Sequence, residues 1–364
     1  MRVLLLTTDA YGGHGGIALY NRDLAQALAE MPSVEEVVVI PRTMPLPPEP
    51  MPAKVRFIAG AAGGKARYVL AALGAARGHF DVLICGHINL LPLAALLNLK
   101  LHASLVSMVY GIDVWQPPRP WTRRLLGRVD AVWSISAITK DRMNEWAGLE
   151  EHRFTVLPNA IHMERYGLDE RRQDLLAKLG LSGRRVLMTL ARMPSFERYK
   201  GIDEVLESMP ELLCRVPDLA YLVVGGGEDQ PRLQAKAIAL GLGDRVVFAG
   251  RVDEASKADY FRLADVFVMP GRGEGFGFVF LEAMACGIPV VGSLLDGSRE
   301  ALLGGELGEL ANPADPASVQ DCVLRALDKP RHVPPGMHFF AWPKFRERLA
   351  LALHSLDSRQ PPSV

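Results

Sequence analysis

Two glutamates that enclose an apolar block are the first candidates for chemistry. Glu274 and Glu282 stand eight positions apart in "EGFGFVFLEAMACG". Gly275 and Gly277 permit a tight turn, and a helix is predicted to begin near Phe278, so that its free N–H groups could receive phosphate oxygens. Carboxylates repel phosphate, but they suit the acceptance of hydrogen bonds from sugar hydroxyls. As alternatives, the first is a helix N-terminal charge and the second is a paired residue at the edge of the core.

A second pair of charged residues follows a predicted strand earlier in the chain. Arg192 and Lys200 flank the loop "ARMPSFERYKG", which comes directly after the apolar run "RVLMTLA". Two cations at the carboxyl end of a strand could hold a diphosphate, the arginine through two hydrogen bonds and the lysine as a point charge. The alternative is a solvated basic loop.

A glycine-rich loop follows the first predicted strand, in "DAYGGHGGIALY". Gly15 and Gly16 allow close approach of the backbone to a ligand, and a helix is predicted to start at about Ile17, which suits an anion. The segment also matches the dinucleotide pattern G-x-G-x-x-G/A. A nicotinamide site further requires an acid near the end of the second strand, and that strand ends in Pro41-Arg42. A dinucleotide-dependent oxidoreductase is therefore a remote alternative, and His14 is interpreted as a loop imidazole.

The elements that position these loops form two series. Short apolar runs alternate with amphipathic segments, which indicates parallel sheets covered by helices on both faces. The fold class is thus α/β, with two doubly wound domains facing a central cleft, where ligands bind beyond the carboxyl ends of the strands. We expect one domain over 1–158 plus a C-terminal helix at about 343–364, and the other over 159–342. Strands are predicted at 2–8, 36–40, 55–58, 81–86, 104–111, 130–136, 154–159, 184–192, 219–227, 245–250, 265–270 and 288–293.

Composition limits the function classes. Lys+Arg and Asp+Glu both total 41 among 364 residues, so nothing global indicates a nucleic-acid partner. The cysteines form no CxxC pair and are typical of free thiols in a reducing cytosol. We expect the first residues to form a strand rather than a signal peptide, and no segment to span a membrane. No His/Asp/Cys cluster in the sequence has the spacing of metal ligands.

Together these segments resemble family 4 glycosyltransferases, which have the GT-B fold. The resemblance rests on the E-x7-E segment, on "TLARMPSFERYKGIDEVLESM" and on the N-terminal glycine loop with its helix. It covers nearly the whole chain and is strongest over 185–305. It implies a nucleoside-diphosphate sugar donor, with Glu282 accepting from the ribose hydroxyls and Glu274 from the donor sugar. The diphosphate would be held by Arg192, Lys200 and the backbone at Gly277 and Phe278.

The resemblance also implies a reaction and its partners. The family transfers with retention of anomeric configuration and without a bound metal, since cations and a helix N-terminus stabilise the departing nucleoside diphosphate. The acceptor hydroxyl would be held by the first domain, on a lipid-linked or growing surface glycan, in the cytoplasm. A nucleotide-sugar epimerase and a protein that only binds the nucleotide sugar are the alternatives.

One position departs from the family pattern. Tyr110, in "SMVYGIDVW", stands where the family often has a histidine, while Asp113 remains. A tyrosine can hydrogen-bond a donor sugar hydroxyl, but it cannot become an imidazolium near neutral pH. His87 also follows a strand end, and it is interpreted either as a site residue or as a cap of the next helix.

A basic segment with an aromatic and apolar face suggests a membrane edge. It surrounds Trp121 in "RPWTRRLLGRV". Basic residues beside such a face suit anionic lipid surfaces. A solvated amphipathic helix is the alternative.

Overall fold

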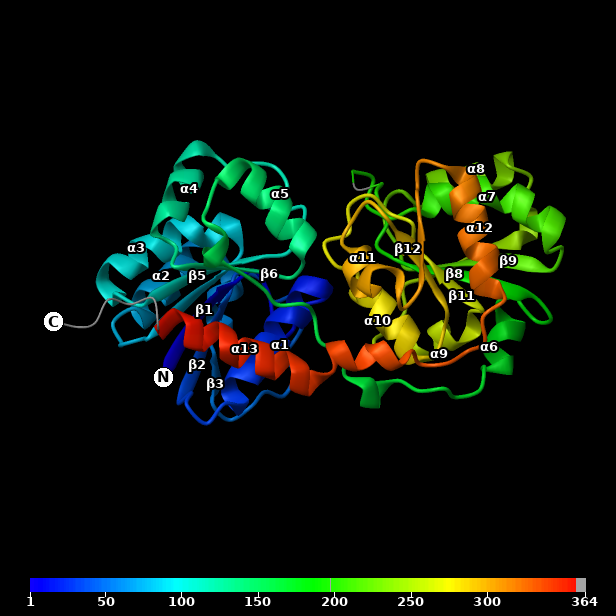
Figure 1. Cartoon of the computed structure of the whole chain (residues 1–364). Helices are drawn as coiled ribbons and strands as arrows, with labels where there is room; N and C mark the ends of the chain where they lie inside the picture. Colours follow the sequence, from blue (N-terminus) through cyan, green and yellow to red (C-terminus); the bar gives the residue numbers. More distant parts are fainter. Residues whose placement is uncertain (197, 358–364) are drawn as a thin grey trace. The chain divides into compact units, whose positions relative to one another are not determined.

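The chain folds into two compact units, each built around one parallel sheet. The computed structural model describes residues 1–196 and 198–357. Unit 1 comprises Met1–Ala160 together with the C-terminal segment from Trp342, and unit 2 comprises Ile161–Ala341 (Figure 1). The sequence analysis predicted the two domain boundaries after residues 158 and 342.

Unit 1 contains a sheet of seven strands in the order β3-β2-β1-β4-β5-β6-β7, and every pairing is parallel. The inner strand β1 has Leu4 paired with Val38 on one side and with Leu83 on the other. Because parallel neighbours need crossover connections, a helix or helical turn follows most strands. The strands are β1 (Arg2–Thr7), β2 (Glu36–Pro41), β3 (Val55–Phe57), β4 (Val82–Gly86), β5 (Ser104–Val109), β6 (Ala131–Ser134) and β7 (Phe154–Val156).

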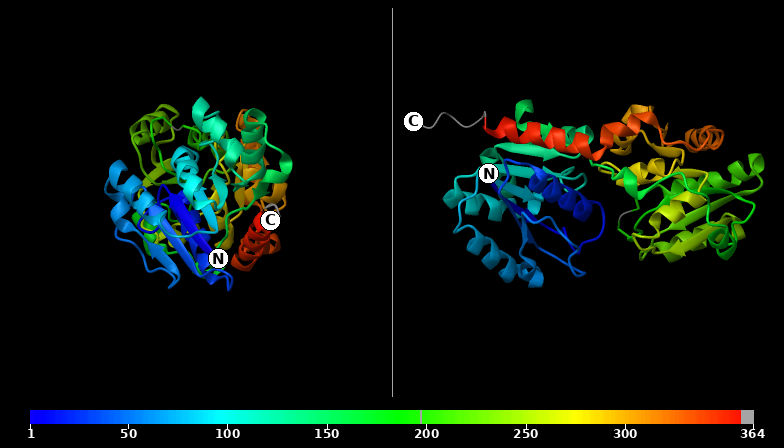
Figure 2. Two further views of the ribbon diagram at one scale, coloured as in Figure 1. Left: turned by 90° about the vertical axis from the view of Figure 1, so that its left-hand side faces the viewer. Right: turned by 90° about the horizontal axis from the view of Figure 1, so that it is seen from below.

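Helices cover both faces of this sheet (Figure 2). On one face, Leu4 and Leu6 share a core cluster with Tyr68 and Leu97 from two of the helices. On the other face the first and last helices contact each other, and the rings of Tyr20 and Phe345 meet edge to face, 5.8 Å apart. The helices are α1 (Gly16–Glu30), α2 (Lys65–Ala75), α3 (Leu91–Leu101), α4 (Pro120–Leu125), α5 (Ala137–Ala147) and α13 (Trp342–Asp357).

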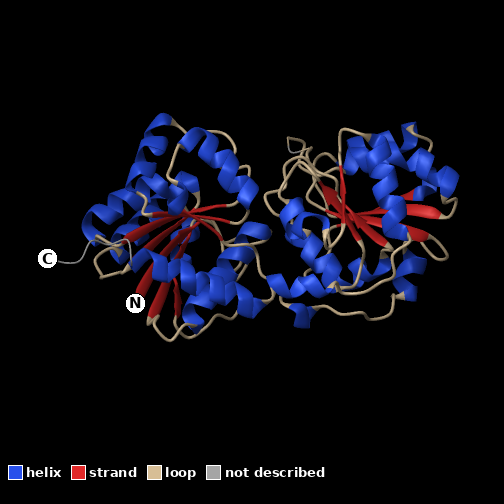
Figure 3. Cartoon of the chain, viewed as in Figure 1, coloured by secondary structure: helices blue, strands red, loops and turns tan. Residues whose placement is uncertain are grey.

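Unit 2 repeats the architecture with six parallel strands in the order β10-β9-β8-β11-β12-β13. Figure 3 shows the strands of each unit gathered in one layer between helices. The strands are β8 (Arg185–Leu190), β9 (Leu219–Val224), β10 (Val246–Gly250), β11 (Val266–Val268), β12 (Val290–Ser293) and β13 (Glu309–Ala311). The helices are α6 (Gln173–Lys178), α7 (Ile202–Arg215), α8 (Gln230–Ala239), α9 (Lys257–Leu263), α10 (Phe278–Ala285), α11 (Ser298–Ala301) and α12 (Pro316–Leu327).

The predicted α/β class with two parallel sheets is confirmed, and every predicted strand is present. The sequence missed β13, because this edge strand has three residues and begins with a glutamate, which gives no apolar run. Within the described part of the chain, no helix combines the length and the apolar character that crossing a bilayer requires.

Candidate active site

The loops that follow β8 and β11 pack directly against each other. A Cβ on Gly201, which has a φ of +79°, would lie 2.7 Å from the carbonyl oxygen of Pro270. A Cβ on Gly273 would lie 2.7 Å from the ring of Tyr199. The Arg272 N–H also donates to the Tyr199 carbonyl at 2.8 Å. Glycines at these positions therefore let two strand ends share one surface, as their order in the sheet requires.

This packing joins Lys200 and Glu274, which are 74 positions apart in the chain. The Lys200 Nζ lies 2.6 Å from the Glu274 Oε2, and both side chains are largely buried. Burial lowers the pKa of Lys200, but the Glu274 carboxylate outweighs it, and the net pKa is raised. The exposed Arg192 is close enough to oppose this shift. The structure thus joins Lys200 to the first glutamate that the sequence selected, and Arg192 lies within electrostatic range of Lys200.

Asp296 holds the backbone of Glu274 in place, and the sequence analysis did not select this residue. Its carboxylate accepts from the Glu274 N–H at 3.0 Å and from the Ser298 hydroxyl at 2.6 Å. The side chain is fully buried, and burial raises its pKa from the ordinary 3.8 to about 6. Asp296 follows β12, so the rule that selected the other strand-end loops could also have found it.

Helix α10 begins where the sequence predicted, at Phe278. Its N-cap residue, Gly277, has a φ of +90° and no side chain caps the helix. A Cβ on this glycine would lie 2.5 Å from the Phe280 ring. The tight turn therefore leaves the first backbone N–H groups of α10 without a side-chain acceptor, as an anion site requires.

Glu282 lies inside unit 2 as part of a buried polar cluster. It is 0% exposed, and its Oε1 accepts from Lys257 at 2.6 Å and from the Tyr166 hydroxyl at 2.8 Å. Burial raises the pKa of Glu282, and this carboxylate helps to raise the pKa of Lys257 against the effect of burial. Its Oε2 has no hydrogen-bond partner among the described residues. Glu282 is therefore a paired residue, as the alternative interpretation of the sequence expected. Its contact with a ribose stays a prediction, for which Oε2 is the available acceptor atom.

In unit 1 the glycine loop lies at the carboxyl end of β1. Gly15 has a φ of +94° and precedes α1, and a Cβ added to it or to Gly16 would meet no atom within 4 Å. A proline-rich loop between β2 and β3 closes over Gly12, since Glu49 of this loop accepts from the Gly12 N–H at 2.6 Å and pairs with Arg22. The open glycines keep the space that the anion prediction needs.

Tyr110 and Asp113 follow β5 at the same edge of that sheet. The Tyr110 hydroxyl donates to the Asn21 Oδ1 at 2.7 Å and is buried, so it points into unit 1 rather than away from it. It can still accept one hydrogen bond, and its predicted contact with a sugar stays a prediction. The Asp113 carboxylate accepts from the Tyr110 N–H at 3.1 Å, and burial raises its pKa to about 7. His87 accepts from the Asn89 N–H at 3.1 Å, which is the capping role.

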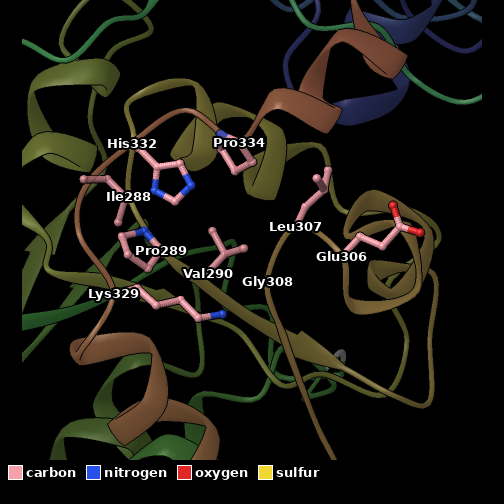
Figure 4. A pocket seen from close by; sticks show the side chains of 9 residues that line it. All are labelled: Ile288, Pro289, Val290, Glu306, Leu307, Gly308, Lys329, His332 and Pro334. Atoms are coloured by element: carbon pink, nitrogen blue, oxygen red, sulfur yellow. The ribbon is translucent and has the colours of Figure 1, made fainter.

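A cavity of about 200 Å³ in unit 2 lies away from these loops (Figure 4). Its wall includes Pro289, directly before β12, and Gly308, directly before β13, so it opens at the amino ends of these strands. Lys329 and His332 contribute basic side chains to its lining. Because Lys200 and Glu274 follow the carboxyl ends of β8 and β11, this cavity lies at the opposite edge of the sheet and does not belong to their site.

Both halves of the chain match known families. Residues 14–165 match the description "Glycosyltransferase Family 4", and residues 184–329 match "Glycosyl transferases group 1". The chain is 30% identical over 322 residues to the phosphatidyl-myo-inositol mannosyltransferase of Mycobacterium leprae, covering 84% of this chain and 78% of the relative. The chain belongs to glycosyltransferase family 4. The predicted resemblance is thereby confirmed, and so is the enzyme class.

A further relative agrees with this assignment. The GDP-mannose-dependent alpha-(1-6)-phosphatidylinositol monomannoside mannosyltransferase of Mycolicibacterium smegmatis is 33% identical over 258 residues, covering 66% of each chain. Among solved structures, this glycosyltransferase is similar to Anabaena HepE in complex with UDP and glucose, with a TM-score of 0.76, 19% identity and coverage of 98% of this chain and 100% of that one. Sucrose-phosphate synthase of Thermosynechococcus elongatus gives a TM-score of 0.75 at 21% identity, covering 99% and 100%. These neighbours show the GT-B fold.

Proposed function

We propose that this glycosyltransferase moves a sugar from a nucleoside-diphosphate sugar to a hydroxyl of a lipid-linked or growing surface glycan, with retention and without a metal. The observation that carries the proposal is the contact between Lys200 and Glu274, in the loop that leads into α10. A cation, a carboxylate and free helix N–H groups at one strand edge suit a ligand that carries both phosphates and sugar hydroxyls.

Each residue takes a role that its surroundings allow. Lys200, Arg192 and the N–H groups at Gly277 and Phe278 hold the diphosphate and stabilise its charge as the bond to the sugar breaks. Glu274 accepts from the donor sugar, and the unpartnered Oε2 of Glu282 accepts from the ribose. When the donor binds, Lys200 exchanges part of its contact with Glu274 for phosphate oxygens. The acceptor hydroxyl, held by unit 1, forms the new bond to the sugar.

The relatives guide the choice of substrates. Two of them carry phosphatidylinositol mannosyltransferase names, and one of these names GDP-mannose, while a structural neighbour was solved with UDP and glucose. GDP-mannose is therefore the first donor to test and UDP-glucose the second. We propose that the enzyme acts on a glycolipid acceptor as a peripheral protein at the cytoplasmic surface of a membrane.

A transfer assay tests the function. The full chain is incubated with each donor and with phosphatidylinositol-containing vesicles, and the products are separated by mass spectrometry. We expect a sugar-bearing lipid whose anomeric configuration, read by NMR, equals that of the donor, in equal yield with and without EDTA. An epimerised donor without transfer would indicate an epimerase, and donor binding without any product would indicate a binding protein. Inversion, or loss of transfer with EDTA, would refute the mechanism.

A further inference from the structure

Two donors converge on one oxygen of the buried Glu282 carboxylate. The Lys257 Nζ lies 2.6 Å from Oε1, and the Tyr166 hydroxyl donates to the same Oε1 at 2.8 Å. The other oxygen, Oε2, is buried and has no hydrogen-bond partner among the described residues. A buried carboxylate oxygen without a donor is costly, so this asymmetry indicates that a ligand supplies the missing hydrogen bond. The direction in which Oε2 points depends on how firmly Oε1 is held.

The two donors differ in how precisely they can hold Oε1. Lys257 carries a point charge at the end of a flexible stem, and it also pairs with Glu254 at 3.0 Å. The Tyr166 hydroxyl stands on a rigid ring that has only two side-chain torsions. Tyr166 is therefore the donor that fixes the plane of the Glu282 carboxylate, while Lys257 balances its charge.

The backbone that carries Tyr166 is anchored to helix α9. The Arg262 Nε donates to the Gly167 carbonyl at 3.1 Å, and the Arg262 guanidinium pairs with Asp169 at 2.7 Å. Arg262 lies on α9, and the same helix begins at Lys257. One helix therefore positions both of the donors that meet Oε1.

The following residue ties the same segment to the helix that carries Glu282. A Cβ on Gly287, two positions past the end of α10, would lie 2.0 Å from the Leu168 Cδ2. Because this glycine has no side chain, Leu168 packs directly against the end of α10. Helices α9 and α10 thus both hold the segment that aims Tyr166 at Glu282.

We propose that Tyr166 is a positioning residue of the donor site, which fixes the Glu282 carboxylate so that its Oε2 receives a ribose hydroxyl. Tyr166 lies between the two segments that match the family descriptions, which end at residue 165 and begin again at residue 184. The family matches therefore do not cover it. The inference rests on the proposed function, because that function supplies the nucleoside diphosphate, and it adds a residue to the donor site.

Binding of nucleoside diphosphates to the full chain tests this role. Calorimetry with GDP and UDP first shows which nucleotide the wild type binds more tightly, and the 2′,3′-dideoxy form of that nucleotide is then measured. Tyr166→Phe removes the hydroxyl and keeps the ring. We expect this change to weaken the ribose form about tenfold, as the loss of one hydrogen bond to a charged group implies. The dideoxy form should bind the variant as it binds the wild type.

Tyr221→Phe is the matched control. Tyr221 is fully buried on β9 of unit 2, and its hydroxyl lies 2.7 Å from the Thr189 Oγ1. The Thr189 hydroxyl also donates to the Val268 carbonyl, so it keeps a partner when the Tyr221 hydroxyl is removed. This variant should bind both nucleotide forms as the wild type does.

Transfer kinetics separate positioning from chemistry. The ribose lies away from the bond that breaks between the sugar and the diphosphate. Tyr166→Phe should therefore raise the KM for the donor about tenfold and leave kcat within about twofold of the wild-type value. A lower kcat with an unchanged KM would contradict a positioning role at the ribose.

The outcomes distinguish this inference from the proposed function. Equal weakening of the ribose and dideoxy forms by Tyr166→Phe, or no weakening of either, would overturn the positioning role and leave the proposed function standing. Tighter binding by the variant would show that Tyr166 covers the carboxylate, which would also overturn the role. Selective weakening of the ribose form, in an enzyme that transfers no sugar to any acceptor, would support the role and refute the proposed function.

Discussion

At the residue scale, the site is a set of charged side chains that contact each other. Lys200 contacts Glu274, Lys257 contacts Glu282, and Asp296 holds the Glu274 backbone. Glu274 and Glu282 therefore pair with different lysines. We expect removal of the charge of each glutamate to affect donor binding and transfer differently.

The two glutamates should divide the donor between them. Glu282→Gln should weaken both the nucleotide sugar and the free nucleoside diphosphate, because it removes the charge beside the unpartnered Oε2. Glu274→Gln should leave free nucleoside diphosphate binding nearly unchanged and slow transfer by one to two orders of magnitude, as expected for one charged hydrogen bond of about 1.5–3 kcal/mol made in the transition state. Calorimetry and transfer kinetics decide. Equal weakening of the free diphosphate by both changes would refute this division.

Asp296 should make the stability of unit 2 depend on pH. Its folded pKa of about 6 lies above the ordinary 3.8, so the folded state keeps a proton that the unfolded state has lost. The stabilising contribution is full below pH 3.8 and is lost as pH rises towards 6. Relative to Asp296→Asn, wild type should lose about 2 kcal/mol between pH 4.5 and 7.5. Hydrogen exchange of unit 2 amides measures this, and a difference that stays constant with pH would contradict the assignment.

At the element scale, glycines decide how closely the loops after the strands approach. Gly297 sits in the turn before α11, and its N–H donates to the Glu274 carbonyl at 2.8 Å. A Cβ there would lie 2.1 Å from the Gly275 carbonyl oxygen. The φ of −66° suits any residue, so the contact alone requires glycine.

Gly297→Ala should therefore separate the loop that carries Glu274 from the one that carries Asp296. We expect at least a tenfold loss of donor affinity with both sheets intact, because a shift of about 1 Å misplaces the binding groups. Gly74→Ala is the control, since a Cβ on that residue of α2 meets nothing within 4 Å and should be neutral or slightly stabilising. Calorimetry and circular dichroism provide the two readouts. Donor affinity equal to that of wild type would show that the loop contact is dispensable.

At the scale of the whole molecule, the two units can be observed separately. All five tryptophans, Trp115, Trp121, Trp133, Trp146 and Trp342, belong to unit 1. Tryptophan fluorescence therefore follows the unfolding of unit 1, while hydrogen exchange of the amides around β8, β11 and α10 follows unit 2.

A nucleoside diphosphate should stabilise unit 2 selectively. At a hundred times its dissociation constant, a ligand stabilises the unit that binds it by about 2.7 kcal/mol. We expect this protection in the amides of the β8 and β11 loops and the first turn of α10, with an unchanged tryptophan-monitored transition. Protection confined to the glycine loop of unit 1 would show that the nucleotide binds unit 1, and it would refute the proposed diphosphate site in unit 2.

The sequence by itself determined the strands, the two-unit α/β class and the loops that could carry chemistry. Continuous apolar runs and glycines at strand ends are local signals, and they located Arg192, Lys200, Glu274 and the start of α10. The three-residue edge strand β13 gave no such signal and was missed.

Only the tertiary structure decided which side chains meet. Tyr166 and Lys257 reach Glu282 across 116 and 25 positions, and the Tyr110 hydroxyl points at Asn21 across 89. Helix α3 contacts both α2 and α4 only once the sheet sets these helices side by side. Such contacts depend on strand order and on close backbone approach at glycines, and neither is written in the spacing of any one segment, because spacing describes neighbours along the chain and not across it.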